Sequence, residues 1–253
     1  GYPAEPLEEQ PKGSLMLYSS GTTGKPKGIK RPLDGSKIGD PDLIGAGLVG
    51  GIFGINEQSV YLSPAPLYHS APLGFTTGTQ SVGGTVVVLE KFDPLEALQA
   101  IEHHGVTHSQ WVPTMFTRML KLAEEERNRW DLSTHKLAIH AAAPCPVEVK
   151  KQMLEWWGPI LHEYYAGTEL NGFCYVGPED WLTHPGTVGK PLIGSLRICD
   201  EDGIEFPAGE SGLIYFEREE QTFEYHQAPD KTKSSQHPNN PLWTTLGDVG
   251  RVD

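Results

Sequence analysis

The chain has 253 residues, which is enough for one large domain or two, and carries a formal net charge of −13 at pH 7. Such an acidic chain is a poor match for nucleic acid or an anionic membrane surface, because both attract basic patches. Its three cysteines, Cys145, Cys174 and Cys199, show no C-x-x-C spacing, so they indicate neither a zinc knuckle nor a disulfide framework, and we expect a reducing, cytoplasmic setting.

The first predicted functional element is a phosphate-binding loop. The apolar run that ends at Tyr18 predicts a strand, and glycines, hydroxyls and two lysines follow it in the order Ser19, Ser20, Gly21, Thr22, Thr23, Gly24, Lys25, Pro26, Lys27, Gly28. Glycines let backbone N–H groups approach an anion, while the lysines supply positive charge. A polar surface loop is the alternative, but the density of polar residues favours phosphate.

This loop is not a Walker A loop. That motif requires a glycine where Ser19 stands and a serine or threonine where Pro26 stands. Because the hydroxyl that binds Mg²⁺ in that design is missing, the metal must be held by another residue.

The next glycine-rich segment, Gly45 to Gly50, matches G-x-G-x-x-G. A dinucleotide site would need a hydrophobic strand before it and an acidic residue about twenty positions later. Neither is present, so we expect a tightly packed segment in which small residues admit a neighbouring element.

Strand-like and helix-like segments then alternate. We predict helices over Pro94–His104, from Pro113 through the charged run that ends at Arg129, and over Val147–Trp157; strands are predicted over Val106–Val112, Lys136–Ala142 and Ile160–Tyr165. Asp93 provides a helix N-cap and Gly105 a stop. This alternation predicts an α/β fold with a mostly parallel sheet flanked by helices.

After Gly167 the helical periodicity fades. Short β-rich segments such as Ser195–Cys199 and Gly212–Phe216 predict a small antiparallel subdomain, and Gln227–Pro241 is expected to be an exposed loop. We therefore expect an α/β subdomain over 1–167 and a β-rich subdomain over 168–253, incomplete at its carboxyl end.

The end of one predicted strand carries a second candidate site. Tyr164, Tyr165, Ala166, Gly167, Thr168 and Glu169 combine aromatic rings, a small-residue turn, a hydroxyl and a carboxylate. In open α/β sheets, ligands bind at the carboxyl edge of the strands. These groups could stack a base, approach a phosphate and hold Mg²⁺. The alternative is an ordinary turn with one exposed glutamate.

The remaining candidates are weak. His104 and His108 are four residues apart, but Gly105 breaks the helix that would align them on one face for zinc. Cys145 lies between two prolines with no evident base nearby, which favours a packed thiol over a nucleophile.

Taken together, the motifs resemble the adenylate-forming superfamily, which contains acyl-CoA synthetases. The resemblance follows the family order through nearly the whole chain, with segments Ser19–Gly28, Pro66–His69, Tyr164–Glu169, Gly209–Leu213 and Gly247-Asp248. It implies activation of a carboxylate by ATP to an acyl-adenylate, then transfer to coenzyme A. The implied partners are a small-molecule carboxylate, ATP and CoA, with Mg²⁺ as cofactor.

The resemblance also implies roles for individual residues. The loop, through Thr22, Thr23 and Lys27, would bind the β- and γ-phosphates; Tyr165 would pack on adenine with Tyr164 and Ala166 beside it. Thr168 would contact the α-phosphate, Glu169 would hold Mg²⁺, and Asp248 would bind the ribose. His69, Ala141 and Gly167 would line the substrate pocket.

Two departures from the family pattern affect these expectations. Ala141, Ala142 and Ala143 stand where many members carry Gly-Gly-Ala, so extra methyl groups narrow the adenine or acyl pocket. The family's mobile carboxyl-terminal domain, with its catalytic lysine, is expected beyond Asp253. We therefore expect a central fragment of a longer protein, and a poor catalyst by itself.

The acyl substrate is partly readable. Amino-acid-activating members place an aspartate in the acyl-pocket segment, whereas Tyr68 to Pro72 contains no acid, so a fatty or related non-amino acid is expected. The alternatives are an adenylating enzyme with a carrier-protein or other acceptor, and a nucleotide-binding module without catalysis.

Overall fold

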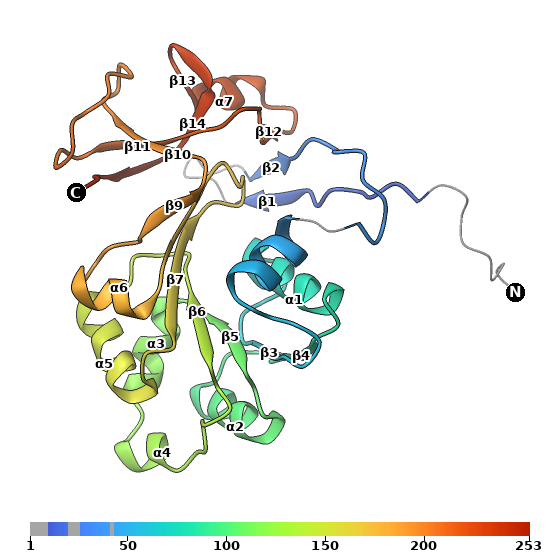
Figure 1. The fold of residues 1–253 in the computed structure, drawn as a ribbon, viewed down its shortest axis with the longest axis vertical. Helices are drawn as coiled ribbons and strands as arrows, with labels where there is room; N and C mark the ends of the chain where they lie inside the picture. The colour runs from blue at the N-terminus through green and yellow to red at the C-terminus, as the bar shows by residue number, and fades with distance from the viewer. Residues whose placement is uncertain (1–9, 20–25, 41–42) are drawn as a thin grey trace, which may run out of the picture.

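The computed structural model describes residues 10–19, 26–40 and 43–253. A seven-stranded sheet lies at its centre, with strands in the order β4-β3-β5-β6-β7-β8-β9 (Figure 1). Their bounds are β3 Val60–Ser63, β4 Thr85–Val88, β5 His108–Trp111, β6 Leu137–His140, β7 Leu161–Ala166, β8 Phe173–Val176 and β9 Lys190–Ile193. Neighbouring strands from β4 to β7 are parallel, and β8 and β9 join antiparallel. The predicted α/β class with a mostly parallel sheet is confirmed.

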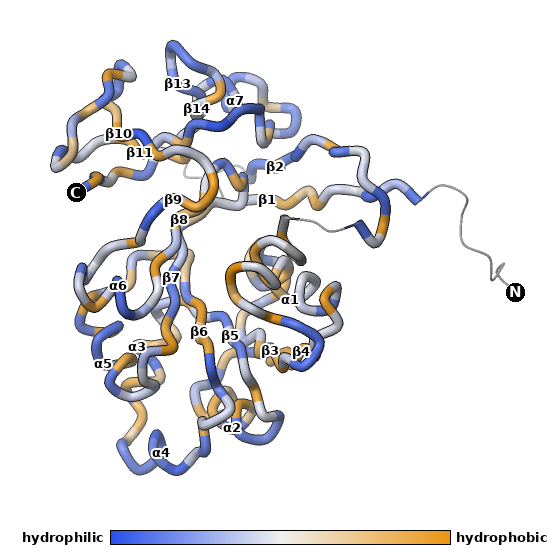
Figure 2. The backbone as a smooth tube through the Cα atoms, in the orientation of Figure 1, coloured by the Kyte–Doolittle hydropathy of each residue, from blue (hydrophilic) through white to orange (hydrophobic). Residues whose placement is uncertain are grey.

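Helices cover both faces of this sheet. On one face lie α2 (Pro94–His104), α3 (Pro113–Leu120), α5 (Val147–Trp157) and α6 (Pro178–Thr183); on the other lie the π-helix η1 (Leu43–Ile52) and α1 (Ser70–Ser81). The central strand β6 is largely hydrophobic (Figure 2), because its Ala138 faces one core and its Ile139 the other. This arrangement leaves the carboxyl ends of β5, β6 and β7 free to carry functional groups.

Helix α2 is the clearest case of a boundary set by local chemistry. The Asp93 side chain accepts hydrogen bonds from the N–H groups of Leu95 and Glu96, at 2.9 and 3.2 Å, which satisfies two donors that the first turn leaves unpaired. At the other end Gly105 adopts the left-handed conformation, with φ 60°. The predicted span Pro94–His104 is confirmed.

The glycine-rich segment 45–50 lies in η1, which packs against α1. A Cβ placed on Gly78 of α1 would lie 2.8 Å from Cγ2 of Val49, so the two elements meet too closely for a larger residue. The expectation of close approach between small residues is therefore met, and the segment lies inside a helix instead of forming the strand-to-helix turn of a dinucleotide fold.

The long helix predicted from Pro113 to Arg129 was wrong. It ends at Leu120, and a separate short helix, α4 (Glu124–Asn128), follows. The Glu126 carboxylate accepts a hydrogen bond from the Ala123 N–H at 3.1 Å, so the chain starts a new helix there instead of continuing the first.

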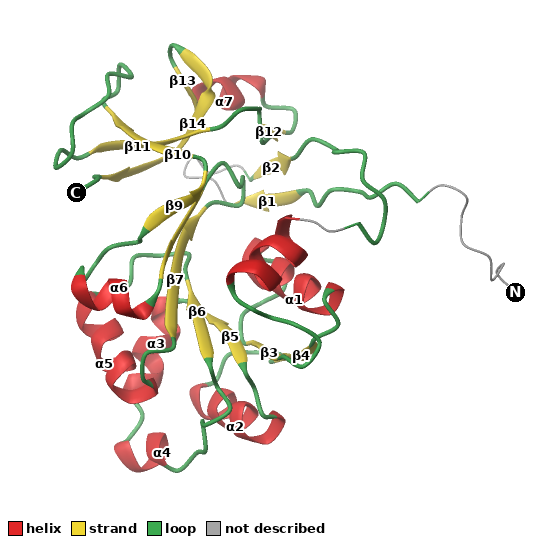
Figure 3. Ribbon diagram, viewed as in Figure 1, coloured by secondary structure: helices red, strands yellow, loops and turns green. Residues whose placement is uncertain are grey.

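The carboxyl-terminal part is rich in antiparallel strands (Figure 3). One sheet has the order β10 (Ser195–Cys199), β11 (Gly212–Glu217), β14 (Asn240–Gly250) and β13 (Gln236–His237). A second joins β1 (Leu17–Ser19), β2 (Lys27–Lys30) and β12 (Glu224–Tyr225), and so ties this part to the strand that follows the predicted phosphate loop. The expected boundary at Gly167 falls inside the seven-stranded sheet, at the turn between β7 and β8.

The segment Gln227–Pro241 is not the exposed loop we predicted. It contains α7 (Pro229–Ser234) and β13, and both Ser235 and His237 are buried. The His237 ring packs against the rings of Tyr215 and Trp243, with centroid separations of 5.3 and 4.9 Å. These apolar contacts come from β11 and β14, which a polar local composition does not reveal. Within the described ranges, no helix has the length and apolar character that crossing a membrane requires.

Candidate active site

A cavity of about 360 Å³ opens at the carboxyl ends of β5, β6 and β7. Trp111 and Val112 line it from the end of β5, and Ala141 and Ala142 follow β6. Ala166 ends β7, and the turn after it contributes Gly167 and Thr168. On the opposite side lie residues of η1 and α1, with His69 just before α1. The expected pocket residues His69, Ala141 and Gly167 thus lie together in one cavity.

Aromatic rings form one wall of this cavity. Tyr164 on β7 stacks between Phe75 and Phe173, with ring centroids 6.0 and 5.0 Å away. Its hydroxyl accepts a hydrogen bond from Nε2 of Gln110 at 3.0 Å, and burial raises the pKa of this phenol. The wall is therefore rigid and neutral, and it can pack against an apolar or aromatic group. Tyr164, expected beside the nucleotide, is part of this wall.

The turn after β7 is packed tightly. A Cβ on Gly167 would collide with Cδ1 of Leu246 and lie 3.0 Å from Oε2 of Glu169. The Thr168 carbonyl accepts a hydrogen bond from Nη2 of Arg31 at 2.6 Å. Arg218 donates to the carbonyls of the two residues that follow Glu169, at 3.1 and 3.2 Å. The turn is thus held from three sides, which fixes the direction of the Glu169 side chain.

Glu169 is buried, and a tyrosine from a distant strand contacts it. Tyr225 on β12 donates its hydroxyl to Oε1 of Glu169 at 2.9 Å, and burial, then the nearby carboxylate, raises the Tyr225 pKa. The Nζ atom of Lys27 lies 4.8 Å from the centroid of the Tyr225 ring. Lys27, Tyr225 and Glu169 therefore form a continuous set, which we call the Lys27–Glu169 row.

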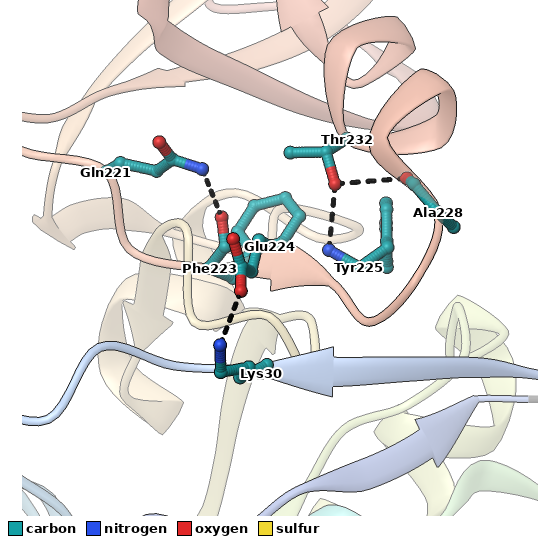
Figure 4. A network of polar contacts seen from close by, with 7 residues as sticks. All are labelled: Lys30, Gln221, Phe223, Glu224, Tyr225, Ala228 and Thr232. Atoms are coloured by element: carbon teal, nitrogen blue, oxygen red, sulfur yellow. Dashed lines mark hydrogen bonds and ion pairs between the residues drawn. The ribbon is translucent and has the colours of Figure 1, made fainter.

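A polar network holds β12 in place (Figure 4). The Lys30 ammonium pairs with Glu224 at 2.8 Å, and the Thr232 hydroxyl accepts from the Tyr225 N–H at 2.9 Å while it donates to the Ala228 carbonyl at 3.3 Å. These contacts come from β2 on one side and α7 on the other. They position Tyr225 in a strand of only two residues.

The other expected nucleotide residues lie along the same edge. The Tyr165 hydroxyl donates to Oδ2 of Asp248 at 2.8 Å, and its ring stacks on Phe216 with centroids 6.1 Å apart. Burial, then the Asp248 carboxylate, raises the Tyr165 pKa. Asp248 is exposed, so its carboxylate is accessible to the hydroxyls of a ribose that enters from solvent.

Some expected residues are not brought into this arrangement. Ala143 is exposed and does not line the cavity. Ser19 ends β1, while the rest of the predicted loop, Ser20, Gly21, Thr22, Thr23, Gly24 and Lys25, lies outside the described residues. The residues that follow the loop are described. Lys27 is the first residue of β2 and forms one end of the Lys27–Glu169 row.

Three functional candidates were missed in the sequence: Arg31, Gln110 and Tyr225. Arg31 could have been predicted as a site residue. Strand alternation places it on the same face as Lys27, which was already a candidate. Gln110 lies among the polar residues His108 and Ser109 of β5, and nothing in the local sequence shows that its side chain reaches Tyr164. Tyr225 carries no local signal, because its partner Glu169 lies in another sheet.

Glu169 has the chemistry of a Mg²⁺ ligand. Mg²⁺ prefers carboxylate oxygens and usually takes one or two of them from a protein, with substrate phosphates and water completing its shell. Outside the undescribed segments, no group of three or more His, Cys, Asp or Glu residues has a geometry that holds a metal. One buried carboxylate, linked to Lys27 through Tyr225, fits a metal delivered with phosphates.

Comparisons with known proteins agree with this geometry. The chain is 26% identical over its whole length to a 2-succinylbenzoate–CoA ligase of Bacillus cytotoxicus, of which it covers 53%. Over 94% of its length it is 28% identical to 4-coumarate–CoA ligase 5 of Oryza sativa subsp. japonica, of which it covers 44%. The chain thus spans about half the length of these curated relatives.

The fold and the family agree as well. The structure of o-succinylbenzoate CoA synthetase from Bacillus subtilis in complex with the acyl-adenylate intermediate OSB-AMP superposes with a TM-score of 0.76 at 26% identity, over 94% of this chain and 46% of that one. The family described as AMP-binding enzyme matches residues 3–226. The chain therefore belongs to the AMP-binding enzyme family, the adenylate-forming superfamily that its motifs resemble.

Proposed function

We propose that this chain is the nucleotide- and acyl-binding core of an acid–thiol ligase that activates a non-amino carboxylic acid with ATP and transfers it to coenzyme A. One observation carries the proposal: the Lys27–Glu169 row and the apolar cavity meet at the turn that follows β7. A cation, a buried carboxylate and an apolar pocket at one sheet edge suit a triphosphate, Mg²⁺ and an acyl group respectively.

The adenylation step needs positioning more than proton transfer. A carboxylate oxygen of the substrate attacks the α-phosphorus, the bond to the bridging oxygen breaks, and pyrophosphate leaves with the electron pair. Since the carboxylate is already anionic, no strong base is required. Lys27 would contact the β- and γ-phosphates, and Thr168 the α-phosphate. Tyr165 and Asp248 would hold the nucleoside. Bound at Glu169, Mg²⁺ would neutralise phosphate charge.

The cavity favours an aryl acid over the fatty acid expected from the sequence. Its wall is built from Phe75, Tyr164 and Phe173, and its volume of about 360 Å³ exceeds the roughly 150 Å³ that admits one benzene ring. The relatives described above are named for succinylbenzoate and coumarate. Among its described lining residues there is no carboxylate, so nothing in this wall would pair with an α-ammonium group. We therefore propose an aryl acid with a short side chain.

The decisive experiment is ATP–pyrophosphate exchange by the full-length protein that contains this chain, run against a panel of aryl, fatty and amino acids. We expect exchange with aryl acids, and exchange with none of the panel would refute the ligase proposal. Glu169→Gln should raise the Mg²⁺ requirement and lower the rate. An unchanged rate would remove Glu169 from the site.

The acceptor and the activity of the isolated chain need separate assays. Thioester formation with CoA, measured by mass spectrometry of the product, would distinguish CoA from a carrier-protein acceptor. Since the chain spans about half of its relatives, we propose that by itself it binds nucleotide weakly and adenylates slowly. Rapid turnover by the purified 253-residue chain would contradict this.

A further inference from the structure

Arg31 is a permanently charged side chain in the wall of a cavity that is otherwise mostly apolar. It follows β2 directly and lines the cavity together with His69, Ala142 and Thr168. Its guanidinium stays protonated at any physiological pH. A charge placed in apolar surroundings costs free energy unless a partner compensates it.

The described residues provide little compensation. The Nη2 atom donates to the Thr168 carbonyl at 2.6 Å, whereas Nε is buried without a hydrogen-bond partner in the described part of the chain. Burial lowers the Arg31 pKa, and attraction to the Glu169 carboxylate opposes this in part. No ion pair with a carboxylate is formed among those same residues. Nε is enclosed, but Nη1 forms no hydrogen bond with the described residues, so the guanidinium keeps a donor for an anion that enters the cavity.

We propose that Arg31 binds the carboxylate of the acyl substrate and holds it for attack on the α-phosphorus. This inference rests on the proposed function. The guanidinium contacts the backbone of Thr168, the residue expected at the α-phosphate, so an oxygen bound to Arg31 lies at the reacting end of the cavity. A planar guanidinium also matches the two oxygens of a carboxylate.

Arg31 would act mainly on substrate binding. A negatively charged carboxylate must approach a triphosphate of the same sign, and a fixed cation between them lowers that repulsion. During attack the carboxylate oxygen forms a bond to phosphorus and its charge passes to the departing pyrophosphate, so no proton moves. The contact therefore stabilises the bound substrate about as much as the transition state, so its loss should raise KM for the acid and change kcat little.

The test uses ATP–pyrophosphate exchange by the full-length protein with its best carboxylic acid. Arg31→Met keeps the length of the side chain and removes the charge, whereas Arg31→Lys keeps the charge and loses the planar fork. The matched control is Arg129→Met, because Arg129 is also an arginine but is exposed just after α4 and does not line the cavity. Each variant is measured for KM of the acid, KM of ATP, kcat and the thermal midpoint.

We expect Arg31→Met to raise KM for the acid about 10- to 100-fold and to change KM for ATP by less than about threefold, as for the loss of a charge-assisted hydrogen bond. Arg31→Lys should restore part of the affinity, and Arg129→Met should behave as wild type. Calorimetric titration of the acid should show the same loss without turnover. If Arg31→Met folds poorly, the same measurements on Arg31→Lys, including the titration of the acid, test the proposal.

Three results would overturn the inference. A rise in KM for ATP with KM for the acid unchanged would assign Arg31 to a phosphate. Equal changes in both, with a lower thermal midpoint, would leave it a structural support for Thr168. Unchanged constants would remove it from the site. Absence of exchange by the wild-type protein with every acid would instead refute the proposed function, and is therefore distinguishable from these.

Discussion

Tyr225 donates a hydrogen bond to Glu169 at 2.9 Å across 56 positions of sequence. The contact joins β12, which pairs with β2, to the turn after β7. The strand that leaves the predicted phosphate loop and the carboxylate expected to hold Mg²⁺ are therefore connected through one phenol. A displacement of β2 would therefore move Tyr225 and change the position of the Glu169 carboxylate.

Removal of the Tyr225 hydroxyl should impair the step for which we propose Mg²⁺. In Tyr225→Phe the buried Glu169 carboxylate loses its donor, so its orientation is less fixed and its unpaired oxygen costs about 1 to 3 kcal/mol. We expect a lower exchange rate and a higher Mg²⁺ concentration for half-maximal activity in the full-length protein. The matched control is Tyr175→Phe, which removes a hydroxyl bonded to His162 at 2.6 Å on β8. The same Mg²⁺ dependence in both variants would contradict the assigned role.

The turn after β7 should not tolerate a methyl group. In Gly167→Ala the new Cβ would collide with Leu246 and crowd Oε2 of Glu169. Overpacking of this kind costs about 1 to 3 kcal/mol, so we expect a lower free energy of unfolding in urea and reduced nucleotide binding. Gly13→Ala is the control, since no atom of the described residues lies within 4 Å of a Cβ placed there.

A double variant separates this clash from general loss of glycine flexibility. Leu246→Ala removes the atoms that the new methyl meets, so Gly167→Ala combined with Leu246→Ala should be less destabilised than the sum of the single variants. Strict additivity would show that Leu246 is not the obstacle.

Much of the fold could be predicted because its signals are local. Helix α2 has its cap, its periodic apolar residues and its stop within a short segment, and strands β5, β6 and β7 follow the same alternation. The turn Tyr164–Glu169 was found for a related reason: it follows a predicted strand end, where an open sheet binds ligands.

The missed features depend on contacts between distant segments. Tyr225 reaches the site because β12 pairs with β2. The segment of α7 and β13 is ordered by the packing of His237 on Tyr215 and Trp243. Hydrophobic periodicity does not encode such pairings. Arg31 is an intermediate case. The strand face on which it lies was predictable from the sequence, but the apolar cavity around it was not.

Ala142 occupies a backbone conformation that favours glycine. Its φ is 74°, in the left-handed region, and the residue lines the cavity. The sequence showed alanine where many family members carry glycine but could not show this strain. In Ala142→Gly the folded state gains about 1 to 2 kcal/mol, while the more flexible unfolded chain offsets about 0.4 to 1 kcal/mol.

We therefore expect Ala142→Gly to raise the free energy of unfolding by about 1 kcal/mol in urea titrations. The neighbouring Ala141→Gly is the matched control, because Ala141 also lines the cavity but has no positive φ. It should lower stability by about 0.5 to 1 kcal/mol. If both substitutions destabilise equally, the conformation of Ala142 carries no strain.

Stability should fall in mild acid because histidines are buried in neutral form. Burial, then the nearby His108, lowers the His135 pKa from 6.5 to about 3, and its Nε2 is hydrogen-bonded to Ser109 at 2.6 Å. Between these two values the unfolded chain binds a proton that the folded chain does not, so the free energy of unfolding decreases as pH falls through this range. The slope is about 1.4 kcal/mol per pH unit for one such group.

Urea titrations between pH 7 and pH 4 would measure this slope. His135→Gln should make it shallower without abolishing it, since burial also lowers the pKa values of His140 and His162. His103→Gln, an exposed position on α2, is the control and should keep the wild-type slope. Because a buried imidazole that stays neutral is the physical cause, a His135→Gln variant with an unchanged slope would show that His135 does not contribute to acid sensitivity.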